Sequence, residues 1–151
     1  MEKPLVLISV AMSLDGYIDD ASPNRLVLSN SEDMAAVDAL RADHDAILVG
    51  ANTLRKDNPS LIIHSEKLKE RRRQAGLEAN PLKVTITSSA NLNSSSRFFH
   101  SGGLANIVYC PESCAPRLRR DLEGLATIID FPGTFAKPEF ILESLYSQGV
   151  K

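Results

Sequence analysis

Hydrophobic and polar positions divide the chain into two kinds of segment. Short apolar or β-branched runs are typical of strands, and they occur at residues 5–11, 46–49, 82–87, 105–109 and 125–129. Apolar residues at helical spacing predict helices at residues 31–42, 116–122 and 138–148, and the charged residues 65–74 predict a solvated helix. Because strands and helices alternate, we expect an α/β protein with a mainly parallel sheet and helices on both faces.

The first two predicted strands are apolar almost throughout, which is typical of strands covered on both faces. We therefore expect residues 5–11 to form a central strand of the sheet and residues 46–49 to be buried on both sides. Gly50 ends the second run, and its missing side chain would let another group approach the backbone closely. Asp15 and Gly16, which follow the first run, predict a turn.

The first predicted helix has a clear start and an amphipathic pattern. Asn30 can cap its first turn, and Met34, Val37 and Leu40 recur at helical spacing and are expected to face the core. Arg41 lies in the last turn, where a cation complements the helix dipole. From the residues alone, that is the simplest role for Arg41.

Composition narrows the classes of function. With 151 residues, the chain suits a single domain, residues 1–151, with a sizeable core. The net charge of −2 gives no basic field for nucleic acid, and no apolar run reaches membrane-spanning length. Two cysteines are too few for a disulfide framework, which favours the cytoplasm. The three scattered histidines and the Cys-x3-Cys spacing do not form a zinc motif, so we expect no metal.

Polar side chains follow three of the predicted strands. They are Ser13, Asp15, Thr53, Asp57 and Ser88. The carboxyl ends of parallel strands meet at one edge of a sheet, and ligands bind there in open α/β folds. The chain lacks the phosphate-binding Gly-x-x-x-x-Gly-Lys-Ser/Thr loop, the Gly-x-Gly-x-x-Gly fingerprint and a nucleophile elbow. The residues therefore indicate a candidate nucleotide cleft, and an ordinary strand-to-helix connection fits the spacing equally well.

Several blocks of the sequence resemble one family. Ala-Met-Ser-Leu-Asp-Gly at 11–16, Leu-Arg-Ala at 40–42, the block 45–61 and Asn-Pro-Leu-Lys-Val at 80–84 occur in this order. They are similar to the C-terminal reductase domain of the bifunctional riboflavin-biosynthesis deaminase/reductase and to the stand-alone archaeal and fungal reductases of that pathway. The zinc deaminase signature is absent from the sequence.

The resemblance implies a dihydrofolate-reductase-like fold and an NADPH-dependent oxidoreductase. The implied reaction reduces the ribosyl group of a ribosylaminopyrimidine 5′-phosphate to ribityl, by hydride transfer to C1′. The cofactor supplies the hydride, and the protein supplies orientation and electrostatics. The family also implies a homodimer that acts on a small molecule, with no nucleic acid and no membrane as partner.

The resemblance also assigns roles to individual residues. It implies cofactor contacts for Ala11, Thr53, Asp57 and Ser88, and substrate contacts for Arg41 and Leu61. An arginine suits a phosphate because its fork donates two parallel hydrogen bonds, so the resemblance favours a functional role for Arg41. Asp57 is also a candidate catalytic proton donor to the imine nitrogen, on the condition that burial raises its pKa.

Two departures from the family pattern affect these expectations. His64 stands where the family often has an arginine, which would weaken phosphate binding near neutral pH. The family's glycine-rich NADPH segment and its last strands are expected beyond Lys151, so the chain would be a partial reductase domain. Two other functions stay open: a non-catalytic domain that binds a nucleotide or a partner, and a pterin or folate reductase of the same superfamily.

Overall fold

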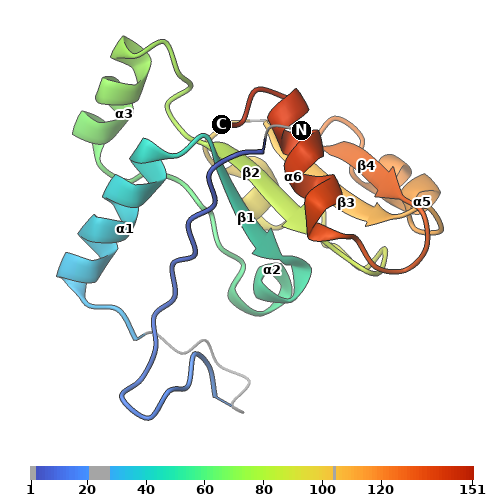
Figure 1. Ribbon diagram of the computed structural model, residues 1–151, viewed down its shortest axis with the longest axis horizontal. Coiled ribbons are helices and arrows are strands. Elements are labelled where there is room, and N and C mark those ends of the chain that lie inside the picture. Colours follow the sequence, from blue (N-terminus) through green and yellow to red (C-terminus); the bar gives the residue numbers. More distant parts are fainter. Residues whose placement is uncertain (1–2, 21–27, 104) are drawn as a thin grey trace.

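The computed structural model describes residues 3–20, 28–103 and 105–151. Its elements in chain order are α1 (Ser31–Asp43), β1 (Ala46–Gly50), α2 (Ala51–Asp57), α3 (Glu66–Gln74), β2 (Leu82–Ile86), α4 (Arg97–His100), β3 (Asn106–Pro111), α5 (Ala115–Asp121), β4 (Thr127–Phe131) and α6 (Pro138–Ser147). Helices and strands alternate as the sequence predicts, and the α/β class is confirmed (Figure 1).

The four strands form one parallel sheet in the order β1-β2-β3-β4. The register pairs Gly50 with Ile86 and Ile86 with Tyr109, so β1 and β2 end level with one another, and β3 and β4 extend two residues further. Their carboxyl ends form one edge, which leads into α2, the 87–96 loop, α5 and the 132–137 loop. The polar residues that follow β1 and β2 are therefore delivered to the same side of the sheet.

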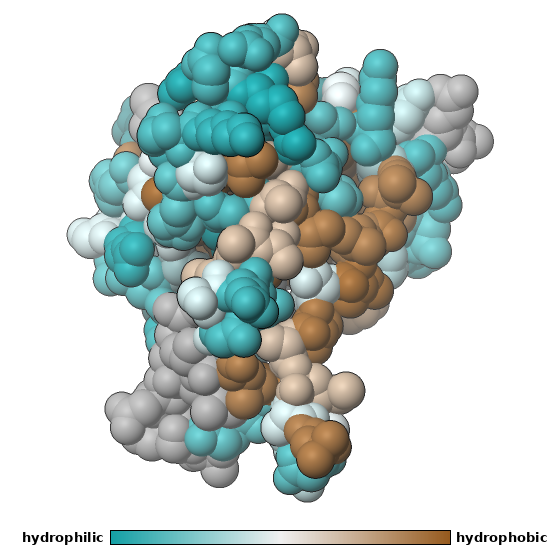
Figure 2. Space-filling model, turned by 90° about the vertical axis from the view of Figure 1, so that its left-hand side faces the viewer, coloured by the Kyte–Doolittle hydropathy of each residue, from teal (hydrophilic) through white to brown (hydrophobic). Residues whose placement is uncertain are grey.

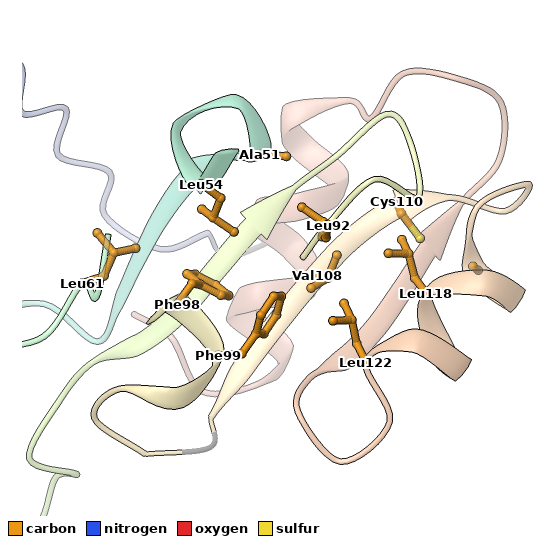
Figure 3. Packing of buried hydrophobic residues seen from close by; sticks show 11 residues of the cluster. Ala51, Leu54, Leu61, Leu92, Phe98, Phe99, Val108, Cys110, Leu118 and Leu122 are labelled. Atoms are coloured by element: carbon orange, nitrogen blue, oxygen red, sulfur yellow. The ribbon is translucent and has the colours of Figure 1, made fainter. Parts of the chain in front are cut away.

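One face of the sheet packs against α2, α4 and α5. Leu54, Phe98 and Leu118 come from these three helices and meet Val108 and Cys110 of β3 (Figure 3). Phe98 also packs edge-on against Phe99, with ring centroids 5.0 Å apart. Such packing contributes beyond simple apolar burial, so this cluster is a main source of stability.

The opposite face of the sheet is covered by α6. Ile141 and Leu145 pack on Tyr109 and Phe131, because alternate residues of β3 and β4 point to this side. The Tyr109 hydroxyl donates a hydrogen bond of 2.9 Å to Ser144 Oγ, which satisfies the polar end of a buried ring. Helices thus lie on both faces, as the sequence predicts.

Lys83 is a buried charged residue on the face that packs against α4. Its side chain is 1% exposed, and its ammonium donates hydrogen bonds to the carbonyls of Phe98 and Ser101 at the end of α4. The ammonium also lies 5.3 Å from the centre of the Phe98 ring. Burial lowers the pKa of Lys83 to about 8.

Residues 5–11 do not form the central strand that their composition predicts. They run as irregular chain past β1 (Figure 1), and Leu5 and Ile8 are 81% and 82% exposed. Figure 2 shows apolar side chains gathered on the side of the molecule that this segment and α1 occupy. An apolar run shows a preference for burial, but a strand also needs a hydrogen-bonding neighbour, and β1 makes its ladder with β2 alone among the described strands.

The expectation that β1 is buried on both faces is also wrong. β1 lies at the edge of the sheet and is only partly covered, so Leu48 is 46% exposed. Gly50 has an ordinary φ of −71°, and a Cβ there would meet no atom of the described residues within 4 Å, so neither the backbone conformation nor a contact within the protein requires a glycine. The turn at Asp15–Gly16 is confirmed.

The core-facing side of α1 also differs from the pattern of its apolar residues. The helix begins at Ser31 with Asn30 as its cap, as predicted. However, Met34 and Leu40 are more than a third exposed, while Asp38 is buried. The reason is that α1 packs beside α3 and the residues just before α3, whose backbone amides bind Asp38, while Leu40 lines a hollow between α1 and β1 (Figure 1).

Candidate functional site

A hollow of about 350 Å³ lies between the N-terminal segment, α1 and the free edge of β1. Three of the residues selected from the sequence line it: Ala11, Arg41 and Leu61. They come from parts of the chain that are 20 to 50 positions apart. Their meeting depends on the helix, the strand and the loop at 61–65, so this hollow is the candidate substrate site.

Arg41 is held at this hollow with part of its guanidinium free. Its Nη1 donates a 2.8 Å hydrogen bond to the carbonyl of Ile62 and lies 3.7 Å from Asp38 Oδ1. Burial lowers the pKa of Arg41 and the nearby Asp38 carboxylate opposes that change, but an arginine stays charged in either case. Nε and Nη2 make no hydrogen bond with the described residues, so they are available to an anion.

Asp38 fastens the 61–65 loop to α1. Its Oδ2 accepts hydrogen bonds from the backbone amides of His64 (2.7 Å) and Ser65 (2.9 Å), and its Oδ1 contacts His64 Nδ1 at 3.1 Å. Burial would raise the pKa of Asp38, but the hydrogen bonds from Ser65 and His64 outweigh it and hold the pKa below its usual value. Asp38 is therefore a carboxylate at neutral pH.

Leu61 is held in an unusual backbone conformation beside the hollow. Its φ of +50° lies in the left-handed region, which a branched side chain rarely adopts, and the residue is 7% exposed. The following residues are fixed by Arg41, by Asp38 and by Asn80, whose side-chain oxygen accepts the amide of Ile63 at 2.9 Å. Such strain persists only where the surrounding contacts determine the loop, which places Leu61 firmly in the wall of the hollow.

Ser88 lines a different hollow, of about 490 Å³, on the face of the sheet that α6 covers. Most of its walls are apolar and come from β1, β2, the 131–138 segment and α6, with Val6 closing one side. Ser88 follows β2 by two residues, so its hydroxyl stands at the carboxyl edge of the sheet. An apolar hollow with a hydroxyl at its rim suits a flat ring with a polar substituent.

Thr53 and Asp57 lie outside both hollows. They share one face of α2 with Lys56, whose ammonium pairs with Asp19 at 2.7 Å, so this face is turned toward the 13–20 segment. Asp57 is only partly buried. The structure thus brings Ala11, Arg41 and Leu61 together and places Ser88, Thr53 and Asp57 elsewhere along the sheet edge.

The sequence analysis did not select Asp38 or His44, although both belong to this region. His44 lines the first hollow, and Asp38 holds Arg41 and His64. The polar position of Asp38, between apolar Val37 and Leu40, was the only signal available in the sequence. Its partner His64 is 26 residues away, so the pairing depends on the tertiary structure.

In residues 3–20, 28–103 and 105–151, no group of three or more His, Cys, Asp or Glu side chains could hold a metal ion. Among the helices described in the same ranges, none combines the length and the apolar character needed to cross a bilayer.

The model of the RibD C-terminal domain matches residues 4–151. The chain belongs to the RibD C-terminal domain family. A curated relative from Archaeoglobus fulgidus, named 2,5-diamino-6-ribosylamino-4(3H)-pyrimidinone 5′-phosphate reductase, is 35% identical over 150 residues, which cover 99% of this chain and 68% of that protein. A reductase of the same name from Methanothermobacter thermautotrophicus is 29% identical over 99% of this chain and 65% of its own length.

Solved structures of related proteins share the fold. A pyrimidine reductase-like protein from Corynebacterium diphtheriae has a TM-score of 0.76 and 21% identity, over 94% of this chain and 60% of its own. A deaminase/reductase from Thermotoga maritima has a TM-score of 0.71 and 24% identity, over 98% of this chain and 37% of its own. The predicted dihydrofolate-reductase-like fold is therefore confirmed, and this family member spans about two thirds of the length of its curated relatives.

Proposed function

We propose that the chain reduces the ribosyl group of a ribosylaminopyrimidine 5′-phosphate to ribityl in riboflavin biosynthesis, with NADPH as the hydride donor. The observation that carries this proposal is the meeting of Arg41, Leu61 and Ala11 at one hollow in a member of the RibD C-terminal domain family. The similar proteins named as pyrimidinone 5′-phosphate reductases support the substrate class.

In this proposal Arg41 binds the substrate phosphate. Its Nη1 is already used by the Ile62 carbonyl, so the free Nε and Nη2 edge of the fork faces the ligand. Two parallel charge-assisted hydrogen bonds would orient the phosphate as well as bind it. The wall formed by Leu61 and the apolar residues of β1 would exclude water from the ribosyl carbon that is reduced.

The residues of the second hollow fit part of a nicotinamide nucleotide. Its apolar walls suit an aromatic ring, and Ser88 offers a hydroxyl to the ribose or the amide. Thr53 and Asp57 would contact other parts of the cofactor from α2. When it is bound, NADPH would supply the hydride, and the chain's own contribution is to hold the two molecules in a reactive orientation.

The test measures loss of NADPH absorbance by the 151-residue chain with the ribosylaminopyrimidine 5′-phosphate, beside a parallel assay with dihydrofolate. Turnover with the pyrimidine alone supports the proposal. Turnover with dihydrofolate alone would replace it with a pterin or folate reductase. NADPH binding without turnover on either substrate would favour a non-catalytic nucleotide-binding domain.

Arg41→Ala should then raise the KM for the phosphate substrate by about tenfold to a hundredfold, because hydrogen bonds to charged groups contribute about 1.5–3 kcal/mol. NADPH affinity should stay nearly constant. Arg117→Ala is a matched control, since Arg117 is exposed and pairs only with Asp121 among the described residues. An unchanged KM in Arg41→Ala would contradict the phosphate-binding role.

We also propose a homodimer in the cytoplasm. The exposed apolar side chains of residues 5–18 and the open edge of β1 support association with a second copy, and the free thiols of Cys110 and Cys114 suit a reducing compartment. Light scattering on the purified chain and fractionation of the source cells test the two statements. A monomer at micromolar concentration would remove the first.

A further inference from the structure

A third hollow, of about 220 Å³, lies between the C-terminal half of α2 and the 87–96 loop. It shares no lining residue with the hollow at Arg41 or with the hollow at Ser88. Its apolar part is formed by Leu54 of α2 and Leu92 of the loop, which are both labelled in Figure 3. The volume is below the roughly 300–1,000 Å³ of sites that take drug-sized ligands, so the hollow suits a small ligand.

Two asparagines at this hollow have side chains whose orientation is fixed by the backbone. Asn58 Oδ1 accepts a 2.8 Å hydrogen bond from the amide of Arg97, and Asn93 Oδ1 accepts a 2.9 Å hydrogen bond from the amide of Ser95. A backbone N–H can only donate, so in both asparagines the oxygen faces the amide and the NH₂ group is left over. Neither NH₂ group has a partner among the described residues, so both are available as donors.

Arg55 supplies the positive charge of this hollow. Its Nη1 donates a 3.0 Å hydrogen bond to the carbonyl of Asn91, and its Nη2 donates to Asn52 Oδ1, so the guanidinium is held between α2 and the loop. Each bond uses one N–H of its nitrogen, and the other N–H groups have no partner among the described residues. Asp57 follows two positions later, on nearly the opposite side of α2, and no acidic residue of the described chain lines the hollow.

The hydroxyl of Ser96 is the second sign of a ligand site. Ser96 lines the hollow and is 7% exposed, and its Oγ has no hydrogen-bond partner among the described residues. It stands at the start of α4 but makes no capping bond to that helix. A buried hydroxyl without a partner costs free energy, so it needs an explanation. An acceptor atom at the floor of the hollow would be that partner.

We propose that this hollow binds a tetrahedral oxyanion, either inorganic phosphate or the phosphate group of a small monoester. The free polar groups around it are NH₂, guanidinium N–H and hydroxyl groups, which donate, together with the Asn91 carboxamide, which can turn either side inward. An oxyanion offers acceptors on all sides and a negative charge to Arg55, so it satisfies these donors through charge-assisted hydrogen bonds. The proposal goes beyond the reductase function, because it concerns neither of the hollows assigned to substrate and cofactor.

The experiment titrates inorganic phosphate into ¹⁵N-labelled protein and follows the side-chain NH₂ signals of Asn58 and Asn93 and the backbone amide of Ser96. Sodium chloride holds the ionic strength constant, because salt screens exposed charges. We expect saturable shifts of these signals with phosphate, and also with glycerol 3-phosphate as a monoester. The tighter of the two probes then identifies the source of the oxyanion. Glycerol is the neutral control, and equal shifts with glycerol would overturn the proposal.

Arg55→Gln should weaken phosphate binding about tenfold to a hundredfold, because it removes charged donors from the hollow. Lys56→Gln is the matched control: it removes the same charge one position away, from a side chain that pairs with Asp19, and should leave the phosphate Kd nearly unchanged. Equal weakening in the two variants would mean that the general charge of α2 attracts phosphate, and would overturn the site.

Asn93→Asp tests the donor argument without changing the shape of the side chain. The carboxylate can still accept the amide of Ser95, but it places a negative acceptor where the NH₂ group was. Phosphate binding at this hollow should therefore be lost, while the dispersion of the remaining spectrum shows that the variant is folded. Retained affinity would contradict the proposal. If the variant does not fold, Arg55→Gln at its exposed position still decides the question.

Two comparisons separate this site from the proposed function. The shifts should persist in Arg41→Ala, which removes the phosphate ligand assigned to the other hollow, and their loss there would overturn the proposal. Displacement of phosphate from these signals by NADP⁺ would assign the hollow to the cofactor and would overturn it as well. The signals do not depend on turnover, so the expected shifts without NADPH oxidation would remove the reductase proposal and leave the oxyanion site in place.

Discussion

Replacing the buried ammonium of Lys83 should change how the stability of the protein depends on pH. The side chain is 1% exposed, and burial lowers its pKa to about 8, from 10.5 in an unfolded chain. Below pH 8 both states carry the proton, and the folded state bears the full cost of a buried charge. Between pH 8 and 10.5 the unfolded state binds more protons, so the free energy of unfolding rises with pH.

The magnitude follows from the size of the shift. One pKa unit corresponds to about 1.4 kcal/mol, so Lys83 should add roughly 1 kcal/mol to the free energy of unfolding between pH 7 and pH 9, and about 3 kcal/mol once the pH exceeds 10.5. Cys110 acts in the opposite direction. Burial raises its pKa to about 11 from 9.0, so its contribution to the free energy of unfolding falls as the pH rises from 9.0 to about 11. A difference between two variants that share Cys110 cancels this term.

The assay is guanidinium unfolding of wild type and Lys83→Met at pH 7, 8 and 9. The difference in unfolding free energy between the two proteins should shift in favour of wild type as the pH rises. Lys67→Met, at an exposed position on α3, is the control and should show no such shift. A difference that stays constant from pH 7 to pH 9 would refute the reasoning. It would mean that the carbonyls of Phe98 and Ser101 compensate for burial, so that Lys83 has the same pKa in the folded and the unfolded chain.

Three further predictions test the core and the site. Phe98→Ala should lower the free energy of unfolding by about 3–5 kcal/mol in chemical denaturation, because a fully buried ring leaves a cavity; a loss below 1 kcal/mol would contradict the packing. Asp57→Ala should weaken NADPH affinity in fluorescence titration, with the exposed Asp43→Ala as control, and equal affinities would remove Asp57 from the cofactor site. Asp38 has a lowered pKa, so its stabilising contribution is complete above pH 3.8 and is lost as the pH falls through the folded pKa. In acid unfolding, Asp38→Asn should therefore lack the part of the stability loss that comes from protonation of Asp38.

The sequence predicted correctly those elements whose own pattern of apolar residues matches the surface that they bury. Residues 82–87 and 105–109 are short β-branched or apolar runs between turns, and both became inner strands. The final helix has an apolar stripe that matches the face buried on the sheet, at Ile141 and Leu145. In these cases local pattern and tertiary environment agree, so the periodicity was sufficient.

The failures concern elements whose environment is set by a distant partner. Residues 5–11 have the composition of an inner strand but no ladder, and the periodic Met34 and Leu40 of α1 stay partly exposed. The site shows the same division: Arg41 and Leu61 could be selected by resemblance and do meet at one hollow. Asp38 could not be selected, because its importance comes from a loop that folds back from 26 positions away.

The strict order β1-β2-β3-β4 has a consequence for how the molecule folds. Each described strand pairs with the one that follows it in sequence, so no crossover has to pass over another strand of the sheet. The sheet can therefore grow by addition at one side, with each new βα unit docking on a finished neighbour. Hydrogen exchange should then be slowest in β2 and β3, which are paired on both sides, and fastest in β1, which pairs with β2 alone among the described strands.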